Sequence, residues 1–417
     1  MTTGSNAFRF RAGAAGRLLC GLAVAAAGLA AVLPQPTAVI WQASVILSEW
    51  GHWLAALALL LLPGGRRSGT DAAGAAAAAA GIVLLLSPLA RALPLNDSLP
   101  PLLERAFGPA PPHAATAQAP RPAPLVVTDL LAGVASDDVI VDEHVYTVVD
   151  GRNLTLDLYR PAFAEGSLPV VIAVHGGGWV GGDKRDLPEL YEYLASRGHV
   201  VAAVAYRLAP RWQFPAAQED LAAAMRYVQG LAHSHGLDPE RIVLLGRSAG
   251  AQIALLAAYT AGDPAIRGAI SFYGPFALRW GYDNPAKPGV VDSSGLLETY
   301  LGGPPATHGE RYLAAEPGRF VSPASPPTLF IQGLRDEHVS PFHAEFVSAR
   351  LIDAGVPHAV VRLPWATHGC DYIFSGPCGQ VATYAVERFL GAVLAARDEP
   401  ADDGAADDDA APAAQLP

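Results

Sequence analysis

Arg241-Ile-Val-Leu-Leu-Gly-Arg-Ser-Ala-Gly-Ala-Gln-Ile-Ala-Leu-Leu-Ala-Ala258 is the stretch from which the architecture of this chain is most readily inferred. Residues 241–245 are apolar and β-branched, as is typical of a buried strand, and residues 251–258 favour a helix. Between them Gly246 and Gly250 flank Ser248 in a tight turn, where a Cβ atom on either flank would collide with the strand or the helix. The pattern predicts a serine hydroxyl held at a helix N-terminus, where backbone amides favour developing negative charge.

A second glycine-rich turn lies upstream. The apolar run Pro169–Val174 predicts a buried strand, and His175-Gly-Gly-Gly-Trp179 follows it directly. Consecutive glycines let backbone amides approach a substrate oxygen without obstruction by side chains, as an oxyanion hole requires. A loop that merely turns the chain is the alternative, and the serine turn downstream disfavours it.

A nucleophilic serine also needs an acid and a base, which follow it along the chain in that order. Residues 328–332 predict another strand, and Asp336 comes just after it, so we expect Asp336 to be the acid. Its neighbour Glu337 is the rival, and His338 is interpreted as a loop residue.

The base is predicted from its position rather than from its residue type, because the chain has 12 histidines. An amphipathic helix is expected over residues 342–355 and a last strand over residues 358–363. His368, with Gly369 beside it, comes directly after that strand and is our candidate base.

Five motifs carry a resemblance to a known family: His175-Gly-Gly-Gly-Trp179, Tyr206-Arg-Leu-Ala-Pro210, Phe214-Pro215, Glu219-Asp220 and Gly246-Arg-Ser-Ala-Gly250. Residues of about 140 to 397 resemble the carboxylesterase branch of the α/β-hydrolases related to hormone-sensitive lipase. They are also similar to the feruloyl-esterase-like (BD-FAE-like) and kynurenine-formamidase-like enzymes. The resemblance implies an α/β-hydrolase fold with Ser248 as nucleophile, His368 as base and Asp336 as its partner.

The resemblance further implies that the amides of Gly177, Gly178 and Ala249 form the oxyanion hole. One departure is Arg247, because esterases of this branch often carry an acidic residue before the serine. The chemistry requires no metal and no organic cofactor. The sequence contains neither a zinc-type His/Cys cluster nor a phosphate-binding or dinucleotide-binding glycine motif.

The function expected from these features is that of a membrane-anchored serine carboxylesterase. It would hydrolyse small to medium acyl esters through an acyl-enzyme intermediate. An amidase or peptidase, or a lipase acting on long acyl chains, would use the same residues. A non-catalytic binding domain would have no need for the serine, acid and histidine together.

Residues 1–93 are rich in alanine and leucine and contain three apolar stretches, Leu18–Leu33, Thr37–Leu62 and about Ala72–Ala90. Because a spanning helix needs about twenty mostly apolar residues, we predict about three transmembrane helices here. The second stretch meets that length best, with its tryptophans as interface anchors, although Glu49 and His52 fall inside it. A cleaved signal peptide is the alternative for the first stretch.

Basic residues predict the orientation. Arg9, Arg11 and Arg17 precede the first stretch, and Arg66 and Arg67 follow the second. Three crossings with these residues in the cytoplasm place the hydrolase region outside it. If the alanine-rich third stretch does not span, the orientation inverts.

Cys370 and Cys378 are the only cysteines outside the N-terminal region and suit a disulfide in an oxidising compartment. Two unpaired thiols are the alternative. Such a bridge would stiffen the loop that carries His368.

The remaining sequence divides into three parts. Residues 94–125 are rich in proline and alanine and are expected to form an extended linker. Residues 126–397 alternate strands and helices, which predicts a mostly parallel sheet with an antiparallel start, and residues 275–322 interrupt the alternation as a candidate lid. Residues 398–417 form an acidic tail that is expected to be disordered. The net charge of −11 argues against a nucleic-acid partner.

Overall fold

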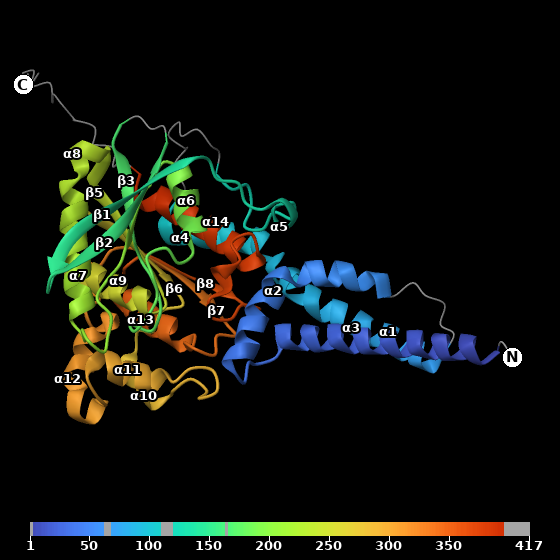
Figure 1. The fold of residues 1–417 in the computed structure, drawn as a ribbon. Helices are drawn as coiled ribbons and strands as arrows, with labels where there is room; N and C mark the ends of the chain where they lie inside the picture. The colour runs from blue at the N-terminus through green and yellow to red at the C-terminus, as the bar shows by residue number, and fades with distance from the viewer. Residues whose placement is uncertain (1–2, 62–67, 110–119, 163–165, 396–417) are drawn as a thin grey trace, which may run out of the picture.

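The protein is described here by a computed structural model that covers residues 3–61, 68–109, 120–162 and 166–395. An eight-stranded sheet forms its centre, with the strand order β1-β2-β4-β3-β5-β6-β7-β8 (Figure 1). β2 pairs antiparallel with β1 and β4, and all other neighbours are parallel. The strands are β1 (Val139–Val149), β2 (Arg152–Pro161), β3 (Leu168–Val174), β4 (Val200–Val204), β5 (Leu237–Arg247), β6 (Ile266–Phe272), β7 (Thr328–Gly333) and β8 (His358–Leu363).

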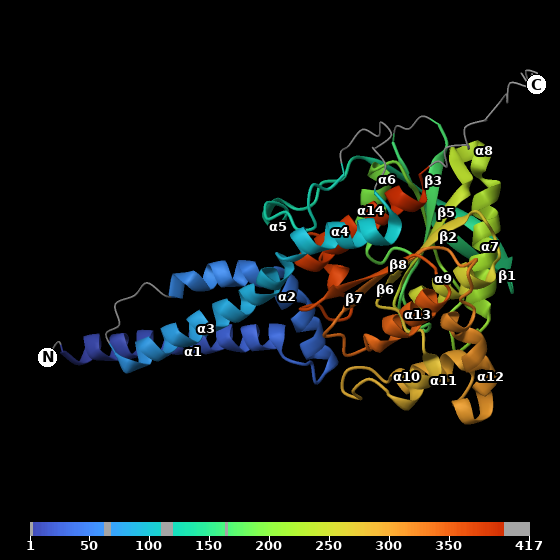
Figure 2. The same ribbon diagram turned by 180° about the vertical axis from the view of Figure 1, so that it is seen from behind.

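Helices cover both faces of this sheet (Figure 2). One face packs against α7 (Ala216–Gly230), α9 (Ala249–Thr260) and α13 (Phe342–Asp353), and the other against α4 (Leu95–Phe107), α6 (Pro188–Ser196) and α14 (Pro377–Val393). The central parallel strands are apolar almost throughout because neither face meets water. The predicted mostly parallel sheet, with helices on both sides, is therefore confirmed.

The antiparallel start of the sheet is the predicted hairpin. β1 and β2 turn at Asp150 and Gly151, which both have positive φ. Two further short helices, α5 (Asp129–Ala132) and α8 (Ala232–His235), lie at the margins of the domain.

Residues 275–322 fold into three helices beyond the carboxyl ends of the strands. They are α10 (Leu278–Asp283), α11 (Ser293–Leu301) and α12 (Pro305–Ala315), followed by the 3-10 turn η2 (Pro317–Arg319). Tyr300 and Tyr312 are fully buried, and the Tyr300 ring stacks on Trp179 with centroids 4.6 Å apart. This insertion is thus packed directly against the glycine-rich turn.

Three N-terminal helices project away from the sheet domain, and the N-terminus lies at their far end (Figures 1 and 2). They are α1 (Thr3–Val32), α2 (Ala38–Ala58), which continues into η1 (Leu59–Leu61), and α3 (Gly69–Ala92). α1 and α3 meet at glycines: a Cβ on Gly21 would lie 2.1 Å from the Gly74 carbonyl oxygen, and one on Gly28 would lie 2.8 Å from that of Gly81. Gly21 faces Gly74, and Gly28, farther along α1, faces Gly81, which is farther along α3. The two helices therefore run parallel.

Among the residues that the structure describes, two helical segments are long and apolar enough to cross a membrane, Gly13–Val32 and Gly69–Phe107. The second predicted stretch, Thr37–Leu62, is not one of them, so the prediction of about three spanning helices is corrected to two candidates. The physical reason is the polar face of α2, where Ser44, Ser48 and Glu49 are buried against other parts of the protein.

The expected extended linker is also wrong in part, because Leu95–Phe107 forms helix α4. Leu99 and Leu103 lie one helical turn apart, and both are buried in the core that α14 shares. The stabilisation from this apolar burial outweighs the cost of the two prolines inside the helix. Residues 110–119 of the linker and the whole acidic tail lie outside the described residues.

Candidate active site

The three predicted triad residues come from different strands and meet at one edge of the sheet. Ser248 follows β5, Asp336 follows β7 and His368 follows β8. These are carboxyl ends of parallel strands, where open α/β sheets place their ligand sites.

Ser248 sits in the tight turn that its neighbours predict. It is a non-glycine residue with positive φ, at φ 51° and ψ −123°. A Cβ on Gly246 would lie 2.3 Å from the Gly250 carbonyl oxygen, and one on Gly250 would lie 2.3 Å from that of His175. Glycine is required at both flanks because the strand, the turn and the helix approach so closely.

A chain of hydrogen bonds joins the three side chains. His368 Nε2 lies 3.0 Å from Ser248 Oγ, and its Nδ1 lies 2.8 Å from Asp336 Oδ2. The other carboxylate oxygen of Asp336 accepts the amides of His338 and Val339 at 2.9 and 2.8 Å. In the tautomer that has the ring proton on Nδ1, the imidazole donates to Asp336, and Nε2 can accept the proton of the serine hydroxyl.

The rival acid points elsewhere. The Glu337 carboxylate pairs with Lys287 at 2.9 Å, and not with the imidazole. Asp336 is therefore the carboxylate that the geometry brings to His368.

The glycine-rich turn after β3 faces the serine. Gly177 has φ 109°, and a Cβ there would lie 2.1 Å from the Gly181 carbonyl oxygen. Gly178 has φ 60° and lies against the Leu296 side chain. Within the described part of the chain, neither the Gly177 nor the Gly178 amide donates to another protein group. These two amides and Ala249, all on the cavity wall, are thus available to an added acceptor.

A cavity of about 800 Å³ opens over Ser248 and His368. Its wall combines the glycine-rich turn, the α10–α11 region and the loops that carry Asp336 and His368. The larger apolar and aromatic side chains of the wall are Trp41, Trp179, Val180, Leu187, Tyr273, Leu278, Val291, Leu296, Leu297, Val339 and Tyr372. Such a chamber suits an uncharged organic substrate with modest apolar groups.

Two histidines beside the triad were not predicted as site residues. The His338 ring stacks on His368 with centroids 4.9 Å apart. Burial, aided by the neighbouring His368, lowers the pKa of His338 to about 4. Burial likewise lowers the pKa of His343 to about 4, and its Nδ1 accepts the amides of Phe276 and Ala277. Both rings are neutral at pH 7.

Arg247, the unusual residue before the serine, is turned into the protein. It is 4% exposed, and its Nε donates to Asp371 Oδ2 at 2.7 Å. Its Nη1 donates to the Tyr191 hydroxyl at 2.9 Å. The other oxygen of Asp371 accepts the Tyr273 hydroxyl, and the Tyr273 ring packs on His368 at 4.5 Å. The arginine charge is therefore balanced behind the triad instead of facing the substrate.

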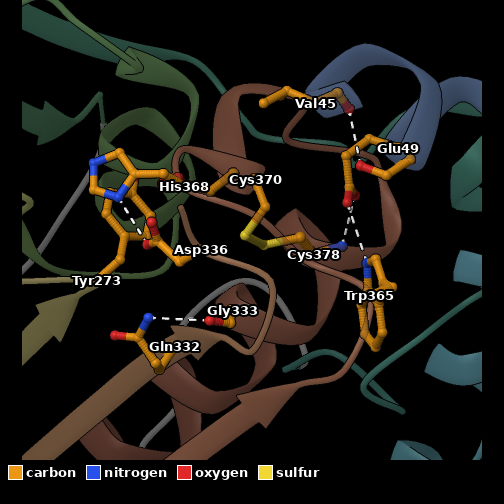
Figure 3. The surroundings of a disulfide bond; sticks show 12 residues. Val45, Glu49, Tyr273, Gln332, Gly333, Asp336, Trp365, His368, Cys370 and Cys378 are labelled. Atoms are coloured by element: carbon orange, nitrogen blue, oxygen red, sulfur yellow. Dashed lines mark hydrogen bonds and ion pairs between the residues drawn. A yellow bond between two sulfur atoms is a disulfide. The ribbon is translucent and has the colours of Figure 1, made fainter. Parts of the chain in front are cut away.

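Cys370 and Cys378 are joined by a disulfide (Figure 3). Cys370 is two residues beyond His368, and Cys378 lies in the first turn of α14. The bond connects the loop of the candidate base to a helix of the core.

Comparison with known proteins finds relatives that are ester hydrolases. The family model BD-FAE matches residues 156–351. The probable carboxylic ester hydrolase LipM of Mycobacterium tuberculosis is 29% identical over 68% of this chain and 68% of its own. Esterase LipQ of the same organism is 30% identical over 59% of this chain and 61% of its own. The chain is an α/β-hydrolase esterase.

Solved structures agree with the fold of this esterase. A variant of the esterase rPPE is 26% identical with a TM-score of 0.53, covering 63% of this chain and 86% of that protein. A bacterial heroin esterase, 24% identical with a TM-score of 0.54, has the same fold and covers 64% and 88%. The N-terminal helices of this esterase lie outside the family-model match.

Proposed function

We propose that the protein is a membrane-anchored serine carboxylesterase that hydrolyses small to medium acyl esters through Ser248, His368 and Asp336. The observation that carries the proposal is the continuous hydrogen-bonded line from Asp336 through His368 to Ser248 Oγ, at 2.8 and 3.0 Å. That line ends in a largely apolar cavity, as an acyl ester requires.

In the proposed reaction, His368 Nε2 takes the proton of the Ser248 hydroxyl while the oxygen attacks the ester carbonyl. The carbonyl oxygen becomes an oxyanion that accepts the amides of Gly177, Gly178 and Ala249. His368 then returns its proton to the departing alcohol, which leaves an acyl group on Ser248. A water molecule, deprotonated by the same imidazole, releases the acid.

Asp336 holds the imidazole in the required tautomer and stabilises its charged form. Its carboxylate is fully buried as a side chain and accepts two backbone amides besides the imidazole. The acid is therefore held in one orientation relative to the imidazole.

The test is hydrolysis of p-nitrophenyl esters of graded acyl length by the full chain in detergent. Ser248→Ala should reduce turnover by more than about 10³-fold, as expected for loss of a triad nucleophile. Ser234→Ala, at an exposed serine of α8, is the matched control and should retain full activity. Undiminished hydrolysis by Ser248→Ala would refute the proposal, and faster turnover of the matching anilides than of the esters would indicate an amidase.

Membrane anchoring is proposed from the N-terminal helices. α1 and α3 expose large apolar side chains to their surroundings, among them Leu19, Leu22 and Val83 at 67%, 50% and 68%. Their close approach at paired glycines is typical of helices that pack inside a bilayer. A lipid environment would cover this surface.

The parallel course of α1 and α3 bears on orientation. If both helices cross the membrane in the same direction, the chain between them has to return to its starting side. We propose that the second half of α2, which packs against α1 and α3, makes this return within the shelter of those two helices, although α2 is not apolar enough to qualify as a span by itself. The N-terminal end of α1 and the start of α3 then share one side, and the sheet domain lies on the other. Arg9, Arg11 and Arg17 of α1 belong to the first side, which the positive-inside rule assigns to the cytoplasm.

We therefore propose that the catalytic domain lies outside the cytoplasm, where the Cys370–Cys378 disulfide would persist. A phosphatase that is active only outside the cytoplasm, fused after Pro417, should be active. A reporter that is active only in the cytoplasm, fused at the same position, should be silent. The reverse pattern would overturn the orientation.

A further inference from the structure

Residues 31–49, the turn between α1 and α2 with the first half of α2, pack onto the rim of the candidate active site. At the acid loop, the guanidinium of Arg335 donates to the carbonyl oxygens of Ala31 and Leu33, each at 2.6 Å. Arg335 directly precedes Asp336. This part of the N-terminal region is thus bonded to the loop of the candidate acid.

The same segment contacts the histidine loop. Gln35 is fully buried, and its side-chain oxygen accepts the hydroxyl of Thr367 at 3.2 Å. Farther along α2, the buried carboxylate of Glu49 accepts the Cys378 amide at 2.7 Å and the Trp365 indole at 3.2 Å (Figure 3). Buried polar groups that are matched in this way specify one relative position of the two parts.

A third contact joins α2 to the insertion. The Ala38 amide donates to the Gly289 carbonyl at 2.9 Å, in the connection between α10 and α11. The loop of Asp336, the loop of His368 and the α10–α11 connection therefore all bond to residues 31–49. This segment lies outside the family-model match of residues 156–351.

Trp41 is the residue of this segment that enters the site. Its indole N–H donates to the carbonyl oxygen of His368 at 3.0 Å. Its ring lies 4.4 Å from the His338 ring, which in turn stacks on His368. Trp41 also lines the cavity. Trp41 therefore contacts the candidate base in two ways, directly at the backbone carbonyl of His368 and indirectly through the ring of His338.

We propose, on the basis of the proposed function, that Trp41 is a positioning residue for His368 and forms the wall of the alcohol side of the ester site. The imidazole gives its proton to the leaving alcohol, so the alcohol lies next to His368. Groups attached to that alcohol extend toward the rings beside the imidazole, which are His338 and Trp41. The N-terminal region thus limits the size of the alcohol in addition to anchoring the protein.

The test compares ethyl butyrate with 1-naphthyl butyrate, which differ only in the alcohol, using the full chain in detergent. Trp41→Ala should lower kcat for ethyl butyrate about tenfold and raise the naphthyl-to-ethyl ratio of kcat/KM about tenfold. Trp41→Phe keeps a ring in the wall but loses the N–H donor. It should keep the wild-type ratio while kcat falls about fivefold.

Trp50→Ala is the matched control, because Trp50 lies on the same helix and is 48% exposed. It should match the wild type on both esters. Kinetics of Trp41→Ala equal to those of Trp50→Ala would overturn the proposal, and so would an unchanged ratio.

A binding measurement separates this proposal from the proposed function. In Ser248→Ala protein, added Trp41→Ala should change the Kd of 1-naphthyl butyrate, followed by naphthyl fluorescence, at least threefold, and added Trp50→Ala should not. If the wild type hydrolyses no ester, the proposed function fails, and the binding result still decides whether Trp41 forms the wall. An unchanged Kd contradicts the wall even in an active enzyme.

Discussion

Arg247 and Asp371 form a buried ion pair behind Ser248, with Arg247 Nε 2.7 Å from Asp371 Oδ2. Each side chain is 5% exposed. The pair connects the residue before Ser248 to the loop after His368, and the Tyr273 hydroxyl on Asp371 adds a ring that supports the imidazole. This buried ion pair therefore joins the turn that carries Ser248 to the loop that carries His368.

Breaking this pair should be costly. Arg247→Gln leaves the Asp371 carboxylate buried without its partner, and the free energy of unfolding should fall by about 3–5 kcal/mol. The kcat should fall as well, because the Asp371–Tyr273 support of His368 loosens. Chemical denaturation and ester kinetics on the same samples check both effects.

The double variant Arg247→Gln with Asp371→Asn is the control for charge. It removes both charges and should recover a large part of the lost stability. A double variant less stable than Arg247→Gln would show that the pair acts through shape and not through its buried charge.

Gly177 should be needed for its backbone conformation. Gly177→Ala brings a Cβ to a position with φ 109° and 2.1 Å from the Gly181 carbonyl oxygen, so the turn has to shift. The amides proposed to hold the oxyanion shift with it, and kcat should fall about 100-fold. Gly181→Ala is the control, since its Cβ would meet nothing closer than 3.8 Å. Equal activity of the two variants would exclude the glycine-rich turn from oxyanion binding.

The packing of α1 on α3 should depend on particular glycines. Gly21→Leu would drive a side chain into the backbone of α3 at Gly74 and should destabilise the helices by about 3 kcal/mol. Gly16→Leu, on the same helix with no atom within 4 Å of the added Cβ, should be tolerated. Thermal unfolding in detergent, followed by tryptophan fluorescence, compares them. Equal midpoints for the two variants would contradict the α1–α3 contact.

Stability should decrease as the pH falls from about 6.5 to about 4. The pKa of His343 is lowered to about 4 in the folded protein, from an ordinary 6.5, because the ring is buried. Between these two pH values the unfolded chain binds a proton at His343 that the folded chain does not bind. The free energy of unfolding therefore falls by on the order of 3 kcal/mol. His343→Asn, whose side-chain oxygen can accept the same amides, should show a smaller loss between pH 7 and pH 4.5. An identical pH dependence in both proteins would contradict the buried neutral ring.

The sequence predicted the sheet and its edge well, because buried parallel strands are marked by continuous apolar runs. The strand predicted over residues 358–363 is β8 residue for residue, and the predicted triad residues follow the ends of β5, β7 and β8. Local pattern is sufficient there, since each side chain is placed by the strand that precedes it.

The missed features depend on contacts between remote segments. Trp41 bonds to His368 across 327 positions of sequence, and no local pattern encodes that approach. The inward turn of His338 follows from how its loop packs, which residue type alone does not reveal. α2 is apolar enough in composition to suggest a span, but its Glu49 is bonded to Trp365 and Cys378 of the sheet domain.

The most direct measurement is mass spectrometry of the full chain, quenched in acid during turnover of p-nitrophenyl butyrate. A butyryl group should be found on the peptide that contains Ser248, and none should be found in Ser248→Ala protein. In His368→Ala protein the adduct should form far more slowly. Steady ester hydrolysis with no acyl group on Ser248, or with the adduct on another residue, would contradict the proposed triad.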